Sequence, residues 1–279
     1  MKSHLLLISS IFALFHSLMN VSWGAGITTH MFMADEAIEY IKDPEFKEFL
    51  RRNQNTMRNG SIFPDSGYIW HNSYGEFAHW DEFHNGYAHY LDQLCQMPLS
   101  PRCEDLFAFF LGTLSHGLSD VYFHRDFISE VSNRDFNGNY QAAHDYSDRG
   151  IDMLSIIDYG RGLVIPSKHF LIEDVKKIFT LCGKDFTLFD LKVRTNTLYA
   201  ALLGERLGSP ISYAYYKYKS NWAQNNYFFG KGGVMDSAQK IAIVWEKAWE
   251  KVVQDQGFSN MAQFRLEGNS FPDIEIMLD

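Results

Sequence analysis

Apolar side chains recur at three- and four-residue steps along most of the chain, which is the spacing of helices with one buried face. In the stretch 234–253, for example, Ile241, Val244, Trp245 and Ala248 share one face. Convincing period-two patterns, typical of strands, are scarce. The pattern predicts helices over residues 31–41, 106–128, 139–157, 172–181, 188–207 and 234–253, with Thr28 or Thr29 as the cap of the first. Long loops are expected over about 54–80 and 207–222, and the whole is expected to be an all-α, single-domain helical bundle.

The N-terminus has the pattern of a secretory signal peptide. Lys2 precedes an apolar run over residues 5–15, which is too short to span a bilayer, and Ser22 and Gly24 supply the small residues of a cleavage site. Residues 1–24 are therefore assigned to a signal peptide and residues 25–279, beginning at Ala25, to one exported domain. Cleavage after Ser22, which would free Trp23, and an uncleaved anchor are the alternatives.

Composition narrows the function classes. The 279 residues are 46% hydrophobic and 21% charged, which is ordinary for a globular protein and excludes a disordered chain. The formal charge is −9, and no run of Lys or Arg is present, so duplex nucleic acid is a poor candidate partner. Three cysteines are too few for a disulfide scaffold. In an oxidising compartment Cys95 and Cys103, which flank a short loop with proline, could form a disulfide; the alternative is three buried thiols.

The most informative segment carries His116, Asp120 and His124 at positions i, i+4 and i+8. On an α-helix each four-residue step drifts by only about 40°, so the three side chains form one stripe. Two imidazoles and a carboxylate on an otherwise apolar helix are costly to bury unless something binds them, and zinc accepts both ligand types. By itself the stripe fits a zinc site and a purely structural cluster of polar side chains equally well.

A second pair, His144 and Asp148, has the same i, i+4 spacing on a predicted helix, with Asp145 and Asp152 near enough in sequence to orient an imidazole. Alone, such a pair is more often a surface contact.

A looser third set consists of His30, Asp65 and His79, which loops could deliver to the same site. Alone, His30 and His79 would be read as ordinary polar histidines.

Taken in order, these residues resemble the zinc-dependent phospholipase C family, and within it the branch of the glycosylphosphatidylinositol-specific phospholipase D catalytic domain. The matching motifs are a His shortly after the signal peptide, an Asp in an F-P-D loop, His-Trp, H-x3-D-x3-H and H-x3-D. They fall within residues 26–30, 62–65, 79–80, 110–116, 120–124 and 135–148. Three residues separate Asp120 from His124, whereas the bacterial, phosphatidylcholine-cleaving members of the family have five. Those members also begin with Trp, whereas cleavage after Gly24 leaves Ala25 first. Both differences fit the phospholipase D branch better.

The resemblance implies a helical fold with three zinc ions. One would be held by Asp65, His79, His116 and Asp120, and a second by His124, His144 and Asp148. A third would be held by His30, by Asp120 as a bridge and by the mature N-terminus, Ala25, although the last of these is the least secure.

The function implied is that of a secreted phosphodiesterase that hydrolyses phospholipids or glycosylphosphatidylinositol anchors. Zinc-activated water attacks phosphorus in such a reaction, and Asp65 is the candidate to orient or deprotonate that water. The expected protein is a monomer that contacts membranes peripherally through aromatic and apolar side chains. Neither the substrate-binding residues nor the choice between C-type and D-type cleavage follows from the sequence.

Two other functions remain open. The first is a zinc-dependent single-strand nuclease, which is similar in fold and metal set and begins with Trp. The second is a non-catalytic lipid- or metal-binding protein on the same scaffold. No G-x-S-x-G or P-loop motif offers a different chemistry.

Overall fold

The computed structural model describes residues 26–71 and 73–258; Ala25 and the predicted signal peptide lie outside them. The helices are α2 (Ile27–Tyr40), α3 (Pro44–Arg52), α4 (Gln54–Ile62), α5 (Gly75–His79), α6 (Asp81–Leu94), α7 (Pro101–Tyr122), α8 (Ser129–Asp135), α9 (Tyr140–Asp158), α10 (Ile172–Leu181), α11 (Leu188–Lys219), α12 (Asn221–Asn226) and α13 (Val234–Gln254). Short turns of other helix types are η1 (Pro64–Tyr68), η2 (Phe123–Ile128) and η3 (Arg161–Leu163). Apart from one isolated bridge between Gln96 and Gly257, the described residues form no β-structure. The prediction of an all-α, single-domain fold is confirmed.

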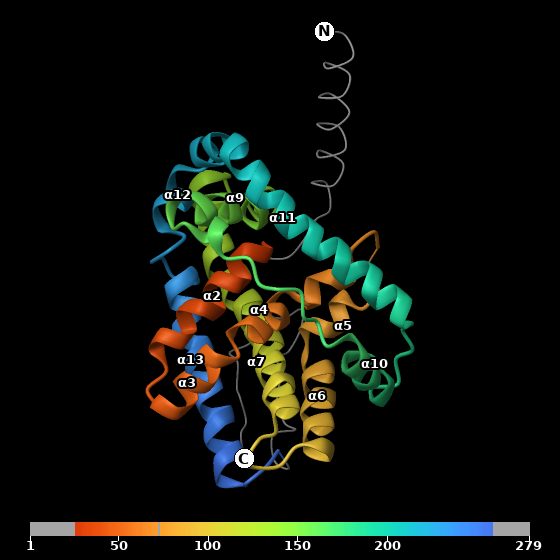
Figure 1. Cartoon of the computed structure of the whole chain (residues 1–279). Helices are drawn as coiled ribbons and strands as arrows, with labels where there is room; N and C mark the ends of the chain where they lie inside the picture. The colour runs from red at the N-terminus through yellow and green to blue at the C-terminus, as the bar shows by residue number, and fades with distance from the viewer. Residues whose placement is uncertain (1–25, 72, 259–279) are drawn as a thin grey trace.

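The apolar helix α7 lies at the centre of the bundle, packed against α4, α6, α13 and α2 (Figure 1). Its contact with α4 is very close. A Cβ atom added to Gly60 would lie 2.2 Å from the Phe109 carbonyl oxygen, and one added to Gly112 would lie 2.1 Å from the Met57 carbonyl oxygen. Only glycine at both positions lets the two backbones approach this far.

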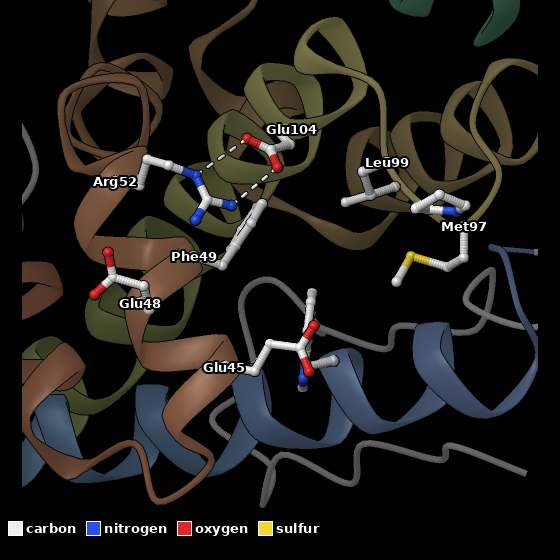
Figure 2. Close-up of a pocket in the computed structure, with 9 residues that line it drawn as sticks. Glu45, Glu48, Phe49, Arg52, Met97, Leu99 and Glu104 are labelled. Carbon is white, nitrogen blue, oxygen red and sulfur yellow. Dashed lines mark hydrogen bonds and ion pairs between the residues drawn. The ribbon is translucent and has the colours of Figure 1, made fainter.

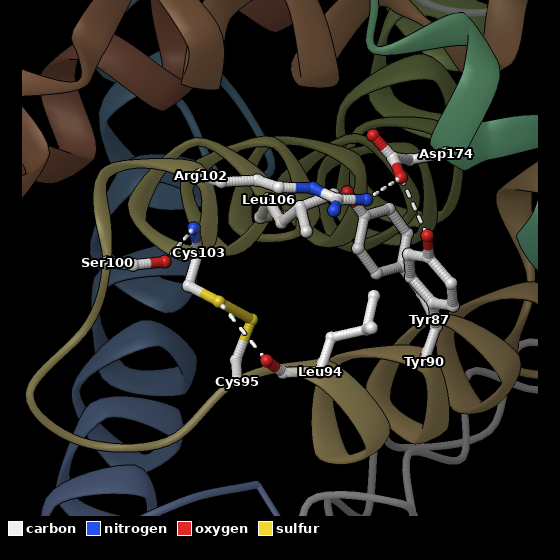
Figure 3. The surroundings of a disulfide bond; sticks show 9 residues. All are labelled: Tyr87, Tyr90, Leu94, Cys95, Ser100, Arg102, Cys103, Leu106 and Asp174. Atoms are coloured by element: carbon white, nitrogen blue, oxygen red, sulfur yellow. Dashed lines mark hydrogen bonds and ion pairs between the residues drawn. A yellow bond between two sulfur atoms is a disulfide. The ribbon is translucent and has the colours of Figure 1, made fainter.

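A disulfide joins the end of α6 to the start of α7 (Figure 3). Cys95 and Cys103 are bonded, and the hydroxyl of Ser100 accepts a hydrogen bond from the Cys103 backbone N–H, which caps α7. The third cysteine, Cys182, is a free thiol. The disulfide thus fixes the outer end of the helix whose other end carries the histidine stripe.

The prediction of a long loop over 207–222 is wrong, because α11 continues through Pro210 to Lys219. A proline inside a helix cannot donate a hydrogen bond to the carbonyl four residues earlier. Here that carbonyl, of Arg206, accepts a hydrogen bond from the Ser209 hydroxyl at 3.2 Å. The side chain thus replaces the missing backbone bond.

The loop expected over 54–80 is also largely wrong. It contains α4, the 3-10 turn η1 and the single-turn helix α5. These elements are short and their apolar spacing is irregular, so periodicity along the sequence does not reveal them. They matter because η1 carries Asp65 and α5 ends at His79.

Candidate metal centre

The structure brings every predicted metal-ligand side chain from residue 30 onward into one buried region. His30 comes from α2, Asp65 from η1, His79 from α5, His116 and Asp120 from α7, His124 from η2, and His144 and Asp148 from α9. Within this region three groups of ligand atoms each lie within 4.8 Å of one another. Two of them share His116 and are together called the first group: His30, His116 and Asp120, and Asp65, His79 and His116. The other, formed by His124, His144 and Asp148, is called the second group.

Asp120 links the groups. Its Oδ2 lies 3.2 Å from Nε2 of His79 and 3.4 Å from Nε2 of His116. Its Oδ1 lies 3.3 Å from Nε2 of His30 and 3.7 Å from Nε2 of His124. The two oxygens of one carboxylate therefore face two different sets of imidazoles, which is the arrangement of a bridging ligand.

The first group is closed by Asp65, whose Oδ1 lies 3.7 Å from Nε2 of both His79 and His116. His30 stacks on His116 with ring centroids 3.6 Å apart. All of these side chains are buried, and none is more than 5% exposed, so the group forms the closed side of the centre.

The second group lies at the more open side. The π-helical turn η2 follows α7 directly and carries His124, whose ring centroid lies 4.8 Å from that of His144. A π-turn inserted in a helix is frequent at functional sites. The side chains of His124 and His144 are 22% and 21% exposed. Nδ1 of His144 lies 3.1 Å from Oδ2 of Asp148. The hydroxyl of Tyr140 donates to the His124 carbonyl beside them.

The hydrogen bonds behind the histidines assign their tautomers. Nδ1 of His79 lies 2.6 Å from the Gly75 carbonyl oxygen, and Nδ1 of His116 lies 2.7 Å from the Ser61 carbonyl oxygen. A carbonyl can only accept, so each Nδ1 carries the hydrogen and a neutral ring leaves Nε2 with a free lone pair. The two Nε2 atoms nevertheless face each other at 2.8 Å, next to Asp120. With both rings neutral this contact is repulsive, and either a proton on one Nε2 or a metal ion between the two would remove the repulsion.

His30 follows the same rule. Its Nδ1 lies 2.7 Å from the hydroxyl of Ser119, which itself donates to the His116 carbonyl. The hydroxyl therefore accepts from Nδ1 of His30, and Nε2 is left free towards Asp120. Metal-binding histidines commonly donate their second ring N–H to an oxygen in this way.

The pKa values of the cluster are strongly shifted. Burial lowers the pKa of His124 to about 4. Burial also lowers that of His79, but hydrogen bonds and charge from Asp120 and Asp65 outweigh it and raise the pKa to about 10. Burial raises the pKa of Asp148 to about 8, a shift that His144 partly offsets. Burial opposes ionisation of Asp120 too, yet the surrounding imidazoles hold its pKa well below its usual range.

These residues fit a zinc centre. Buried polar atoms normally have hydrogen-bond partners. Here, buried ligand-type atoms lack a hydrogen bond of good geometry in His30 (Nε2), Asp65 (both oxygens), Asp120 (Oδ1), His124 (Nε2), His144 (Nδ1) and Asp148 (both oxygens). Imidazole nitrogen together with carboxylate oxygen is a donor set that zinc accepts, and one poorer in oxygen than calcium prefers.

Asp145 and Asp152, which were expected to orient an imidazole, do not hydrogen-bond to the ring of His144. Asp145 is 57% exposed, with its Oδ1 4.0 Å from Nδ1 of His144. Asp152 instead accepts hydrogen bonds from Thr28 and Thr29. The groups that orient His79 and His116 are backbone carbonyls, which no side-chain motif can reveal, and the hydroxyl of Ser119 was missed although it stands next to Asp120.

A cavity of about 270 Å³ lies elsewhere, between α3, the start of α7 and α13 (Figure 2). Its lining includes Phe49 and Trp249 together with Glu104, which pairs with Arg52 at 2.9 Å. None of the metal-centre side chains lines it.

The chain resembles known proteins over most of its length. Residues 29–206 match the family model of zinc-dependent phospholipase C, and the chain belongs to that family. Its curated relatives include proteins named phosphatidylinositol-glycan-specific phospholipase D. The one from Bos taurus is 31% identical over 171 residues, which cover 55% of this chain and 20% of the relative. The one from Mus musculus is 26% identical over 238 residues, covering 80% and 28%, and the one from Dictyostelium discoideum is 27% identical over 235 residues, covering 80% and 25%.

The chain thus spans about a quarter of the length of the relatives that it matches. No solved structure matches it.

Proposed function

We propose that this protein is a secreted, zinc-dependent phosphodiesterase that hydrolyses phospholipids or glycosylphosphatidylinositol anchors. One observation carries the proposal. In a chain of the phospholipase C family, buried imidazole and carboxylate groups gather around Asp120, and several of their ligand-type atoms have no hydrogen-bond partner. The relatives are named as phospholipases specific for phosphatidylinositol-glycan, and these names support the same substrate class.

In this proposal the protein would hold three zinc ions. Asp65, His79, His116 and Asp120 would hold one, His124, His144 and Asp148 a second, and His30 with Asp120 a third. Zinc would supply a lowered pKa for bound water and neutralisation of phosphoryl charge.

The chain's own residues would orient the reaction. Both oxygens of Asp65 are buried without a hydrogen-bond partner, so its carboxylate is free to accept a proton from the attacking water. The partly exposed His124 and His144 mark the side from which a phosphodiester enters. Protein on the opposite side, around His30 and His116, excludes bulk water.

We further propose that residues 25–279 form the catalytic domain after removal of residues 1–24. Gly26 packs closely against α9: a Cβ atom added to it would lie 2.2 Å from the backbone carbonyl oxygen of Asp148. The amino group of Ala25, freed by that cleavage, is proposed as a further ligand on the resemblance alone, because Ala25 lies outside the residues that the structure describes. The disulfide between Cys95 and Cys103 fits an oxidising, exported environment.

The test is product analysis on the purified mature protein. Vesicles of phosphatidylcholine, phosphatidylinositol and sphingomyelin, a glycosylphosphatidylinositol-anchored protein and single-stranded DNA are offered in parallel, and products are identified by mass spectrometry. Diacylglycerol or ceramide would indicate C-type cleavage and phosphatidic acid D-type cleavage. Turnover should disappear with a chelator and return with zinc.

Two variants sharpen this test. Asp65→Asn should lose at least about 100-fold in turnover. Asp92→Asn, which removes an exposed carboxylate on α6, should be unaffected. Cleavage of DNA without cleavage of lipid would replace the proposal with a nuclease, and bound zinc without any turnover would replace it with a binding protein.

A further inference from the structure

The second half of α11 carries a row of exposed apolar side chains. Leu203, Leu207, Ile211, Tyr215 and Tyr218 follow one another at steps of four, four, four and three residues, which places them along one face of the helix. Their exposed fractions are 38%, 77%, 72%, 58% and 95%. We call these five residues the α11 row. A contiguous row of exposed apolar side chains usually marks a surface that contacts another molecule or a membrane.

The loop before α10 extends the row. Leu163 is 92% exposed and Ile165 is 45% exposed. The loop is fixed to α11, because Arg206 donates to the Val164 carbonyl at 3.0 Å and Tyr199 donates to the Pro166 carbonyl at 3.0 Å. The loop that carries these two exposed apolar side chains is therefore held against α11.

The charge of this surface is unusual for the molecule. The chain carries a net charge of −9, yet the exposed positions of α11 between 203 and 219 include no acidic side chain. The only charged ones among them are Lys217 and Lys219, at the end of the row. Lys219 donates to the Tyr215 hydroxyl at 3.1 Å, and Lys217, which contacts Tyr213, also pairs with Asp158 at 3.6 Å.

We infer that the α11 row and Leu163 form the surface by which this protein docks on a lipid bilayer. Aliphatic side chains enter the acyl boundary, and tyrosine and lysine side chains lie at the headgroup level, which is how interfacial helices distribute these residue types. The lysines complement headgroup phosphates. This inference rests on the proposed function, since a phospholipid substrate is presented at a membrane surface.

The position of α11 relative to the metal centre supports the inference. α11 lies along the outside of the molecule with α9 packed against it (Figure 1). The Tyr146 hydroxyl of α9 donates to the Tyr216 carbonyl of α11 at 2.8 Å. α9 also carries His144 and Asp148 of the candidate metal centre. If the protein docks through α11, this neighbouring helix therefore lies between the docking surface and the centre. Among the described residues, no helix is both long and apolar enough to cross a bilayer, so the contact proposed is peripheral.

The test separates binding from turnover. The mature protein is treated with a chelator so that lipid is not consumed, and its co-flotation with vesicles of phosphatidylcholine, with and without phosphatidylserine, is measured. The double variant Leu207→Ser, Ile211→Ser should bind at least about tenfold more weakly, because both side chains lose apolar burial. The matched control Leu94→Ser, Leu181→Ser removes two leucines that are 46% and 48% exposed outside this surface, and should bind as the wild type does.

Two further measurements distinguish the alternatives. Lys217→Gln with Lys219→Gln should reduce the preference for anionic vesicles by about fivefold per lysine. After zinc is restored, the Leu207, Ile211 variant should still hydrolyse a short-chain phospholipid below its micelle concentration.

Unchanged vesicle binding in the Leu207, Ile211 variant would overturn the inference. So would light scattering that shows a dimer which this variant dissociates while vesicle binding is unaltered, since the row would then join two copies of the chain. Binding that depends on the row, in a protein that hydrolyses no phospholipid, would support the docking surface and reject the proposed function.

Discussion

The carboxylate of Asp152 on α9 accepts hydrogen bonds from the backbone N–H and the hydroxyl of Thr29 on α2, at 2.7 and 2.6 Å. Its second oxygen accepts the backbone N–H of Thr28 at 3.2 Å. Asp152 therefore caps the first turn of α2 from another helix, where Gly26 at the N-cap has no side chain to do so. The expectation that Thr28 or Thr29 caps this helix is wrong, because α2 begins at Ile27 and both threonines lie inside its first turn.

This cap bears on the metal centre, because His30 follows Thr29 directly. Glu205 and Arg206 of α11 complete the attachment. The Thr28 hydroxyl donates to Glu205 at 2.9 Å and accepts from Arg206 at 2.7 Å. Burial raises the pKa of Glu205 well above its usual range, and the nearby charge of Asp152 adds to this rise. Asp152 is thus a positioning residue for His30, not a metal ligand.

Asp152→Asn is expected to lower zinc affinity and turnover by about 10–100-fold, because an amide cannot accept hydrogen bonds through its NH2 group and the first turn of α2 loses part of its anchor. The measurements are zinc content by mass spectrometry and the absorption spectrum of the cobalt-substituted protein, which reports the geometry of the ligands.

The control is Asp43→Ala, which removes the N-cap of α3, where the carboxylate accepts from the Phe46 N–H at 2.9 Å. It should lose up to about 1 kcal/mol of stability and keep its zinc and its spectrum. If both variants kept an unaltered cobalt spectrum, Asp152 would be purely structural.

Gly112→Ala is expected to destabilise the protein by about 3 kcal/mol and to reduce zinc binding. The added methyl would overlap the Met57 carbonyl and push α4 away from α7. The Ser61 carbonyl at the end of α4 would then leave Nδ1 of His116, which it now accepts from at 2.7 Å. Thermal unfolding and zinc titration measure the two effects. Gly257→Ala, where a Cβ meets nothing within 4 Å, is the control. If the Gly112→Ala protein were as stable as the wild type and bound zinc fully, the contact between α4 and α7 would tolerate a methyl group and the prediction would be wrong.

His84 is expected to make the protein less stable in mild acid. It is fully buried on α6, with Nδ1 2.8 Å from the Trp80 carbonyl oxygen, and burial lowers its pKa to about 4 from an unfolded value near 6.5. Between these values the unfolded chain binds a proton that the folded protein excludes, so stability is complete above about pH 6.5 and falls as the pH drops towards 4. The loss amounts to about 3 kcal/mol.

His84→Gln should flatten this dependence when urea unfolding is followed from pH 4.5 to pH 7. His89→Gln, at an exposed position on the same helix, should leave the dependence as in the wild type. An equal slope in all three proteins would mean that other groups cause the acid sensitivity.

Much of the fold was predictable because its signals are local. The helix over 172–181 was located to the residue, and those starting at 188 and 234 were located at their first turn, since regular apolar spacing and polar flanks mark them. The helix through Pro210 was not predicted, because proline normally marks the end of a helix and the compensating bond from the Ser209 hydroxyl to the Arg206 carbonyl has no signature in a hydropathy pattern.

The same division holds for the candidate site. Rows such as His116 with Asp120, and His144 with Asp148, were found from sequence because i, i+4 spacing by itself places both side chains on one helix face. Tertiary structure alone turns Asp120 towards both sets of imidazoles, presents the carbonyls of Ser61 and Gly75 to the rings, and sends Asp152 to Thr29 instead of to a histidine. The amino-acid sequence determines which ligand residues are present and in what order, because the covalent chain fixes both. The packing of α4, α7, α9 and α11 decides which atoms meet, because hydrogen bonds and close contacts act across space between residues that the sequence separates.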